Sequence, residues 1–138
     1  MTEPNEQYAY FAVGGDFDPS DISNLVGVSP SECWRKGDLN PRTRYERKFS
    51  RWALYSRLER QRSLEDHVQD VLEQMRVNPV AFGEASTKYA GVMQLVAYFK
   101  TDYPGLSFER ELVKSLAEFS LSVDCDFYFL YSDSREDS

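Results

Sequence analysis

The sequence predicts an α+β fold: a single two-layer domain with helices packed on one face of a mainly antiparallel sheet of about five strands. The chain has 138 residues, 41% of them hydrophobic and 14% aromatic, so it can bury a sizeable core without a disulfide or a metal. Its last strand-like segment, 122–131, alternates between apolar and polar residues, as a strand with one solvated face does. Its helical segments carry single apolar stripes, as expected of helices that cover a sheet.

The first strand is predicted to begin at Tyr8 in YAYFAVGG and to stop at the paired glycines. A short helix follows, because Asp18 is a suitable N-cap, Pro19 fits the first helical position and Gly27 suits a left-handed exit. The apolar stripe of this helix consists of Ile22, Leu25 and Val26.

The middle of the chain predicts a hairpin followed by a helix. SECWRKGD reads as a second strand that ends at Gly37, and KFSRWALYSR as a third, joined by a long connection. Ser63 caps the amphipathic helix LEDHVQDVLEQM, and Asp66 completes a start like a capping box. Asn78-Pro79 ends that helix, and VAFGEASTKY is predicted to be a loop or a short irregular helix.

The last third predicts a central strand, a helix and a final strand. GVMQLVAYFK is the strand, Ser107 caps the helix FERELVKSLAEF, and SVDCDFYFLY closes the domain. The element order is therefore β-α-β-β-α-β-α-β. We expect nearly complete burial of seven core residues: Leu25, Trp52, Val68, Leu72, Leu112, Leu116 and Phe127.

Residues 1–138 are predicted to form one globular domain with frayed ends at 1–6 and 132–138. The start MTEPNEQ lacks a signal-peptide pattern, and two distant cysteines, Cys33 and Cys125, are expected to stay reduced. No apolar run reaches the about 18 residues that span a bilayer. We therefore expect a cytoplasmic protein that does not enter a membrane.

Charge is distributed unevenly along the chain. The net charge is −7, from 16 Lys and Arg against 23 Asp and Glu. The stretch 34–62 nevertheless holds ten basic and three acidic residues, so it carries +7 and the remainder carries −14.

Three interpretations of this basic stretch are open. The acidic face of the helix at 64–76 could neutralise it, which we favour; arginine and aromatic residues could bind a partner protein; or they could bind nucleic acid. Nucleic acid ranks last, because the acidic remainder repels a polyanion. The candidate partner-binding residues are Trp34, Arg42, Arg44, Tyr45, Arg47 and Arg51.

A resemblance to a known family rests on two blocks of sequence. FAVGGDFDPSDISNLVGVSPSECWRKGD and the closing LVKSLAEFSLSVDCDFY make the chain resemble a bacterial family known as domain of unknown function 4279. The similarity extends over nearly the whole chain and implies a soluble, single-domain bacterial protein. It brings no activity and no catalytic residue with it.

No catalytic, cofactor or metal site is predicted from the residues. The only histidine, His67, lies at the edge of an apolar helix face, where a structural role is favoured over catalysis. Capping explains Asp18, and Asp16 and Asp18 lack the spacing of a calcium loop. One histidine and two distant cysteines do not make a zinc site.

We therefore expect a non-catalytic binding protein, in its sharpest form an immunity-like or inhibitory partner protein. That class is an analogy from small size, acidity and polarised charge. The alternatives are a nucleic-acid-binding module using residues 35–62 and a small enzyme with a pocket near Asp16, Asp18 or His67. The sequence leaves the partner and the oligomeric state open.

Overall fold

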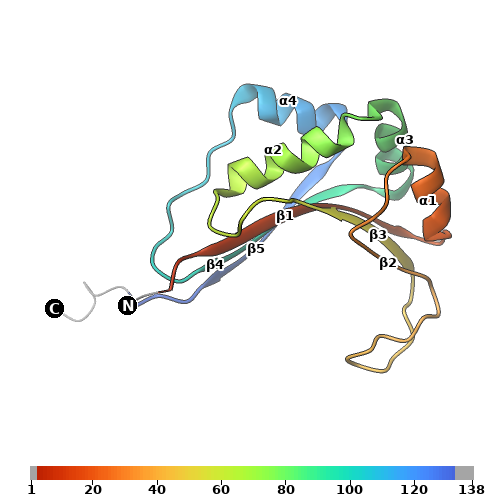
Figure 1. Ribbon diagram of the computed structural model, residues 1–138, viewed down its shortest axis with the longest axis horizontal. Helices are drawn as coiled ribbons and strands as arrows, with labels where there is room; N and C mark the ends of the chain where they lie inside the picture. Colours follow the sequence, from red (N-terminus) through yellow and green to blue (C-terminus); the bar gives the residue numbers. More distant parts are fainter. Residues whose placement is uncertain (1–2, 133–138) are drawn as a thin grey trace.

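The computed structural model describes residues 3–132, which form one five-stranded sheet covered by four helices on a single face (Figure 1). The strands are β1 (Glu6–Gly15), β2 (Glu32–Trp34), β3 (Ser50–Tyr55), β4 (Val92–Phe99) and β5 (Ser122–Phe129). The helices are α1 (Pro19–Val26), α2 (Leu64–Met75), α3 (Pro79–Tyr89) and α4 (Arg110–Glu118). The predicted α+β class is confirmed.

The strand order is β2-β3-β1-β4-β5, and every neighbouring pair is antiparallel except β4 and β5. These two strands are parallel because α4 forms the crossover between them. Of the predicted frayed ends, residues 1–2 and 133–138 lie outside the described residues. The Asn5 side chain accepts hydrogen bonds from the backbone N–H groups of Lys100 and Thr101, and β1 begins at Glu6.

Local signals in the sequence explain the two helices that begin at the predicted caps. In α1 the Asp18 carboxylate accepts from Ser20 N at 3.0 Å, and Gly27 closes the helix at a φ of 73°. In α2 the Ser63 hydroxyl accepts from Asp66 N at 3.1 Å. Both starts confirm the predicted caps.

Two element predictions are corrected by the structure. Residues 79–89 form a regular helix, α3, because Phe82 packs edge-on against Phe11 and Trp52, a tertiary contact that the local sequence does not reveal. The element order is therefore β-α-β-β-α-α-β-α-β. Ser107 does not cap α4, which begins at Arg110; the Ser107 backbone N–H donates to Glu65 instead.

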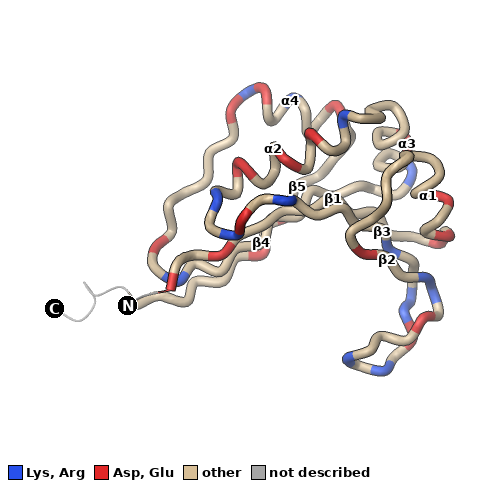
Figure 2. The backbone as a smooth tube through the Cα atoms, viewed as in Figure 1, with Lys and Arg blue, Asp and Glu red and all other residues tan. Residues whose placement is uncertain are grey.

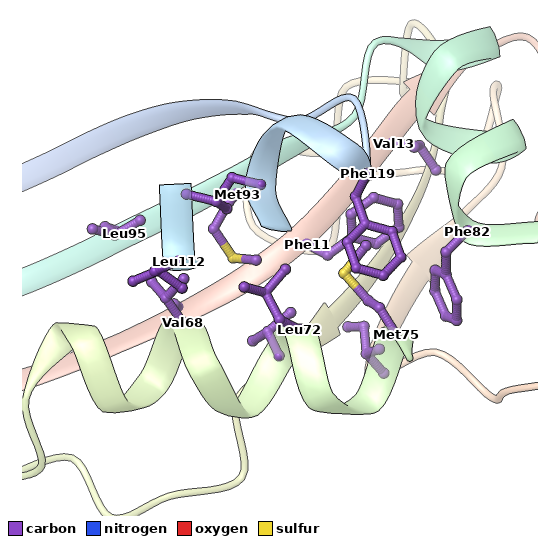
Figure 3. Packing of buried hydrophobic residues seen from close by; sticks show 14 of the residues in the cluster. Phe11, Val13, Val68, Leu72, Met75, Phe82, Met93, Leu95, Leu112 and Phe119 are labelled. Atoms are coloured by element: carbon purple, nitrogen blue, oxygen red, sulfur yellow. The ribbon is translucent and has the colours of Figure 1, made fainter. Parts of the chain in front are cut away.

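The core lies between the helices and the covered face of the sheet (Figure 3). Five of the seven predicted core residues are buried there: Trp52, Val68, Leu72, Leu112 and Leu116. Leu25 was predicted wrongly and is 42% exposed, because the short helix α1 turns Ile22 and Val26 to the core instead. Phe127 is only partly buried, since it lies on the edge strand β5.

Candidate functional site

The face of the sheet opposite the helices, which we call the open face, carries a group of tyrosines. In β1, Ala9, Phe11 and Val13 are buried under the helices, so Tyr8 and Tyr10 point to the other side. The strand register adds partners on the same face: Tyr10 lies opposite Tyr55, and Tyr98 lies opposite Tyr128. The group therefore consists of Tyr8, Tyr10, Tyr55, Tyr98 and Tyr128.

These rings stack on one another rather than lying flat on the sheet. The Tyr10 and Tyr55 ring centroids are 4.5 Å apart, and those of Tyr98 and Tyr128 are 4.9 Å apart, with interplanar angles of 22° and 9°. Stacked rings cover each other's faces and leave their edges and hydroxyl groups to solvent. The open face therefore offers hydrogen-bonding edges more than free aromatic faces.

The surroundings of Tyr8, Tyr55 and Tyr128 raise the pKa of their hydroxyl groups above the ordinary value of 10.0. Burial, followed by the nearby Tyr98, raises the pKa of Tyr8, and burial, followed by Glu32, raises the pKa of Tyr55. The Tyr128 hydroxyl donates to the Asp126 carboxylate at 3.1 Å, and this bond raises the pKa of Tyr128. The protonated hydroxyl groups of Tyr8 and Tyr55 can therefore act as hydrogen-bond donors, whereas Tyr128 already donates to Asp126.

Trp34 links the open face to a cluster of arginines. The guanidinium carbon of Arg47 lies 3.7 Å from the Trp34 ring centroid, and that of Arg51 lies 5.2 Å from it. Arg51 also lies 5.1 Å from the Tyr10 ring centroid. The Nε atoms of both arginines are buried and have no hydrogen-bond partner among the described residues. Arg51 Nε also lies 3.6 Å from a Glu32 carboxylate oxygen. The aromatic rings thus hold both guanidinium groups in place, and Glu32 lies close to that of Arg51.

Residues 35–49, which we call the basic arm, connect β2 to β3 and project from the sheet on the side away from the helices (Figure 1). Backbone hydrogen bonds close the arm into a hairpin, with Gly37 N donating to Arg47 O and Asn40 N donating to Tyr45 O. Its six basic residues outnumber two acidic ones, which gives a net charge of +4. Figure 2 shows this concentration of Lys and Arg. The predicted hairpin is therefore present and carries its charge away from the body of the domain.

Only part of the basic stretch is neutralised by α2. Arg57 pairs with Asp70 at 2.7 Å and Arg62 with Asp66 at 3.0 Å. Burial of Asp70 acts to raise its pKa, but the hydrogen bonds from Arg57 outweigh burial and lower the pKa below its ordinary value of 3.8. The predicted neutralisation by the acidic helix therefore holds for Arg57 and Arg62.

The basic arm is balanced only at its base. Arg35 pairs with Asp18 at 3.1 Å and Lys36 approaches Asp16 at 3.7 Å. The other four basic side chains of the arm have no ion-pair partner within residues 3–132. They are Arg42, Arg44, Arg47 and Lys48. Their charge is available to a partner.

A shallow hollow of about 510 Å³ lies on the open face beside the base of the arm. Small residues make its floor, among them Ala12, Gly14 and Val92. Its walls include Arg51 on one side and Asp124 on the other. The hollow can therefore receive a partner's side chain between a positive and a negative group.

The candidate catalytic residues are not brought together. His67 is fully buried; its Nε2–H donates to the Glu59 carbonyl at 3.0 Å, and its Nδ1 accepts from the Ser56 hydroxyl at 2.6 Å. Burial lowers the pKa of His67, which is therefore neutral at pH 7. The hydrogen bonds of the described residues do not connect His67 to Asp16 or Asp18. Ser56 and His67 resemble a nucleophile and base, but a fully buried ring offers a substrate no access.

The predicted partner-binding residues fall into two groups. Trp34, Arg47 and Arg51 meet at the base of the arm, whereas Arg42, Arg44 and Tyr45 lie farther out on it. Tyr45 is 78% exposed. The tyrosine group was not among the predicted site residues, although the alternation of Tyr8 and Tyr10 within YAYFAV is a signal for its first two members.

The part of the chain that the structure describes holds no group of three or more histidine, cysteine or acidic residues able to bind a metal ion. Within residues 3–132, every helix is too short or too polar to cross a bilayer. The site and fold thus define a two-layer α+β protein with an open tyrosine-rich sheet face and a projecting basic arm. The chain belongs to the family described as Domain of unknown function (DUF4279), which matches residues 5–130. No curated protein and no solved structure matches it.

Proposed function

We propose that this chain is a non-catalytic binding protein that recognises a partner protein through the open face and the basic arm. The observation that carries the proposal is the stack of Arg47, Trp34 and Arg51 at the base of the arm, which holds two partly exposed arginine side chains in place. Tryptophan, tyrosine and arginine are the residues that dominate binding energy at protein interfaces. A partner's carbonyl or carboxylate oxygens would bind the accessible part of these partly exposed arginine side chains.

Charge supports an acidic partner surface opposite the arm. The arm carries +4 on an otherwise acidic chain, so its potential orients an approaching acidic surface and speeds association. In its sharpest form the proposal is an immunity-like or inhibitory role, in which the arm blocks an active partner. We place this role in the cytoplasm of a bacterial cell, since Cys33 and Cys125 are both free, exposed thiols.

The nucleic-acid alternative is less well supported. Base stacking needs free aromatic faces, but the tyrosine rings of the open face stack on each other and Arg47 covers one face of Trp34. Asp124 and Asp126 lie on the same open face and oppose a phosphate backbone.

Site-specific photo-crosslinking in the native host tests the proposal. A benzoylphenylalanine placed at Tyr45 on the arm and another at Tyr55 on the open face should capture the same protein, while one at the exposed Val77, which follows α2, should not. The captured protein, purified, should bind the wild-type chain and bind the Arg47→Ala variant at least roughly ten-fold more weakly. Capture of RNA or DNA from Tyr45, or capture of a protein only from Val77, would contradict the proposal.

The inhibitory form has its own test. The captured protein should slow growth or show an enzymatic activity when expressed alone, and co-expression of this chain should suppress that effect. If the partner's activity is unchanged in the complex, this chain binds the partner without inhibiting it, and the inhibitory form of the proposal is wrong.

A further inference from the structure

The edge strand β5 directs a row of backbone groups into solvent. Ser122 N donates to Gly91 O at 3.1 Å and Leu130 N donates to Phe99 O at 2.8 Å, so the even-numbered residues turn their backbone groups toward β4. Since this direction alternates along a strand, four residues turn their N–H and C=O groups outward. They are Val123, Cys125, Phe127 and Phe129.

Three of the features that commonly protect a sheet edge, namely a short strand, a proline and a bulge, are missing from β5, whose only charged residues are Asp124 and Asp126. Edge strands are commonly short, interrupted by proline or bulged. The opposite edge strand, β2, fits this rule with three residues. In contrast, β5 pairs with β4 over eight consecutive residues without a bulge, and its sequence SVDCDFYF has no proline.

The side chains on the two faces of β5 define the sequence pattern of a strand that could pair with it. On the helix side, Val123 and Phe129 are apolar and are 42% and 56% exposed. On the open-face side, Asp124 and Asp126 add two carboxylates. A strand that alternates apolar residues with lysine or arginine would match both faces.

A second copy of this chain is a poor occupant of the edge. Antiparallel pairing of two β5 strands would bring Asp124 and Asp126 of both copies onto one face. Like charges on neighbouring strands are destabilising, and each chain already has a net charge of −7.

We infer that β5 accepts a β-strand of a partner protein in which apolar residues alternate with lysine or arginine. Backbone hydrogen bonds to the four outward-facing residues would supply affinity, and Asp124 and Asp126 would select the basic side chains. This surface lies at the edge of the sheet farthest from the basic arm, and the inference does not depend on the function proposed for the arm.

Cys125 allows a direct test by thiol–disulfide exchange, with Cys33 on β2 as an internal control. The probe is a synthetic eight-residue peptide of alternating valine and lysine with one valine replaced by cysteine. The peptide is supplied as its mixed disulfide with 2-mercaptoethanol, so that attack by a protein thiol forms the protein–peptide disulfide and releases 2-mercaptoethanol. The intact chain is equilibrated with this probe and increasing 2-mercaptoethanol, and each protein–peptide disulfide is quantified by peptide mapping. The conjugate at Cys125 should withstand at least roughly ten-fold more reductant than the one at Cys33.

Two control peptides separate strand pairing from simple attraction. A glutamate analogue and a lysine analogue interrupted by proline should both lose the preference for Cys125. Equal resistance to reductant at the two cysteines, or full retention by the proline-interrupted peptide, would overturn the inference.

Variants of the protein provide a second check. The double variant Asp124→Lys and Asp126→Lys should reverse the preference, so that the glutamate peptide is retained and the lysine peptide is not. Val123→Pro should weaken retention of the lysine peptide while leaving the thermal midpoint close to wild type, because the lost N–H faces solvent rather than β4. A double variant with unchanged peptide preference would also contradict the inference.

Discussion

The two faces of the same sheet differ in what their side chains contact. Neighbouring residues of β1 illustrate the difference: Phe11 is fully buried among Trp52 and Phe82, whereas Tyr10 stacks on Tyr55 on the open face. The covered face obtains its contacts from within the domain. The open face and the basic arm leave hydrogen-bond donors and charges without internal partners. We therefore expect substitutions on the covered face to change stability and those on the open side to change binding.

The largest expected effect is on the covered face. Phe11→Ala should lower the free energy of unfolding by about 3–5 kcal/mol, because it leaves a cavity between Trp52 and Phe82. Tyr10→Phe, on the same strand but the other face, should cost less than about 1 kcal/mol. Urea denaturation of both variants measures the two losses in the free energy of unfolding. Similar losses would contradict the expected difference between the two faces.

The next largest loss of stability is expected from one of the two ion pairs that α2 makes. Asp70→Asn should cost about 1–3 kcal/mol, because the mostly buried Asp70 carboxylate accepts from both the backbone and the side chain of Arg57. Asp66→Asn should cost less than about 0.5 kcal/mol, since the Arg62–Asp66 pair is exposed on both sides. Chemical denaturation at pH 7 would show whether the two variants differ as expected.

The buried His67 makes stability depend on pH. Its folded-state pKa is lowered from 6.5, so below pH 6.5 the unfolded chain binds a proton that the folded chain does not. The contribution of neutral His67 to the free energy of unfolding should be fully present above pH 6.5. Below pH 6.5 the free energy of unfolding should fall by up to about 1.4 kcal/mol per pH unit. His67→Gln should remove this slope between pH 7.5 and 5.5 in urea titrations. A slope equal to that of the wild type would show that His67 is not the group responsible.

The smallest effect on stability is expected on the arm. Arg42→Ala and Lys48→Ala should change the free energy of unfolding by no more than about 0.5 kcal/mol, because neither side chain has an internal ion-pair partner within residues 3–132. Thermal denaturation at low and at physiological salt would detect a larger change in stability. Such a change would show that these side chains stabilise the fold and are not free for a partner.

Local signals in the sequence predicted the parts of the fold that depend on them. Helix α2 was predicted with its cap at Ser63, because the cap and the apolar stripe lie within one continuous segment. Helix α3 was not predicted as a regular helix, because its sequence contains Gly83 and is only weakly amphipathic. The contact of Phe82 with Phe11 and Trp52, which are distant in the sequence, stabilises it. Local sequence does not contain that contact.

The candidate site shows the same division. Trp34, Arg47 and Arg51 could be selected from composition and spacing, since they lie within one basic stretch. The tyrosine group could not be assembled, because Tyr98 and Tyr128 become neighbours only through the parallel pairing of β4 with β5. Residue types identified the arm, whereas strand order was needed to identify the open face.

Titration of the captured partner against a charge-reversed arm tests the central claim most directly. The triple variant Arg42→Glu, Arg44→Glu and Lys48→Glu is compared with the wild-type chain by calorimetry at 0.15 M salt, after denaturation has shown that both are equally stable. The account predicts binding at least roughly ten-fold weaker in the variant, since its arm repels an acidic surface. Equal affinity of the two chains for the partner would contradict it.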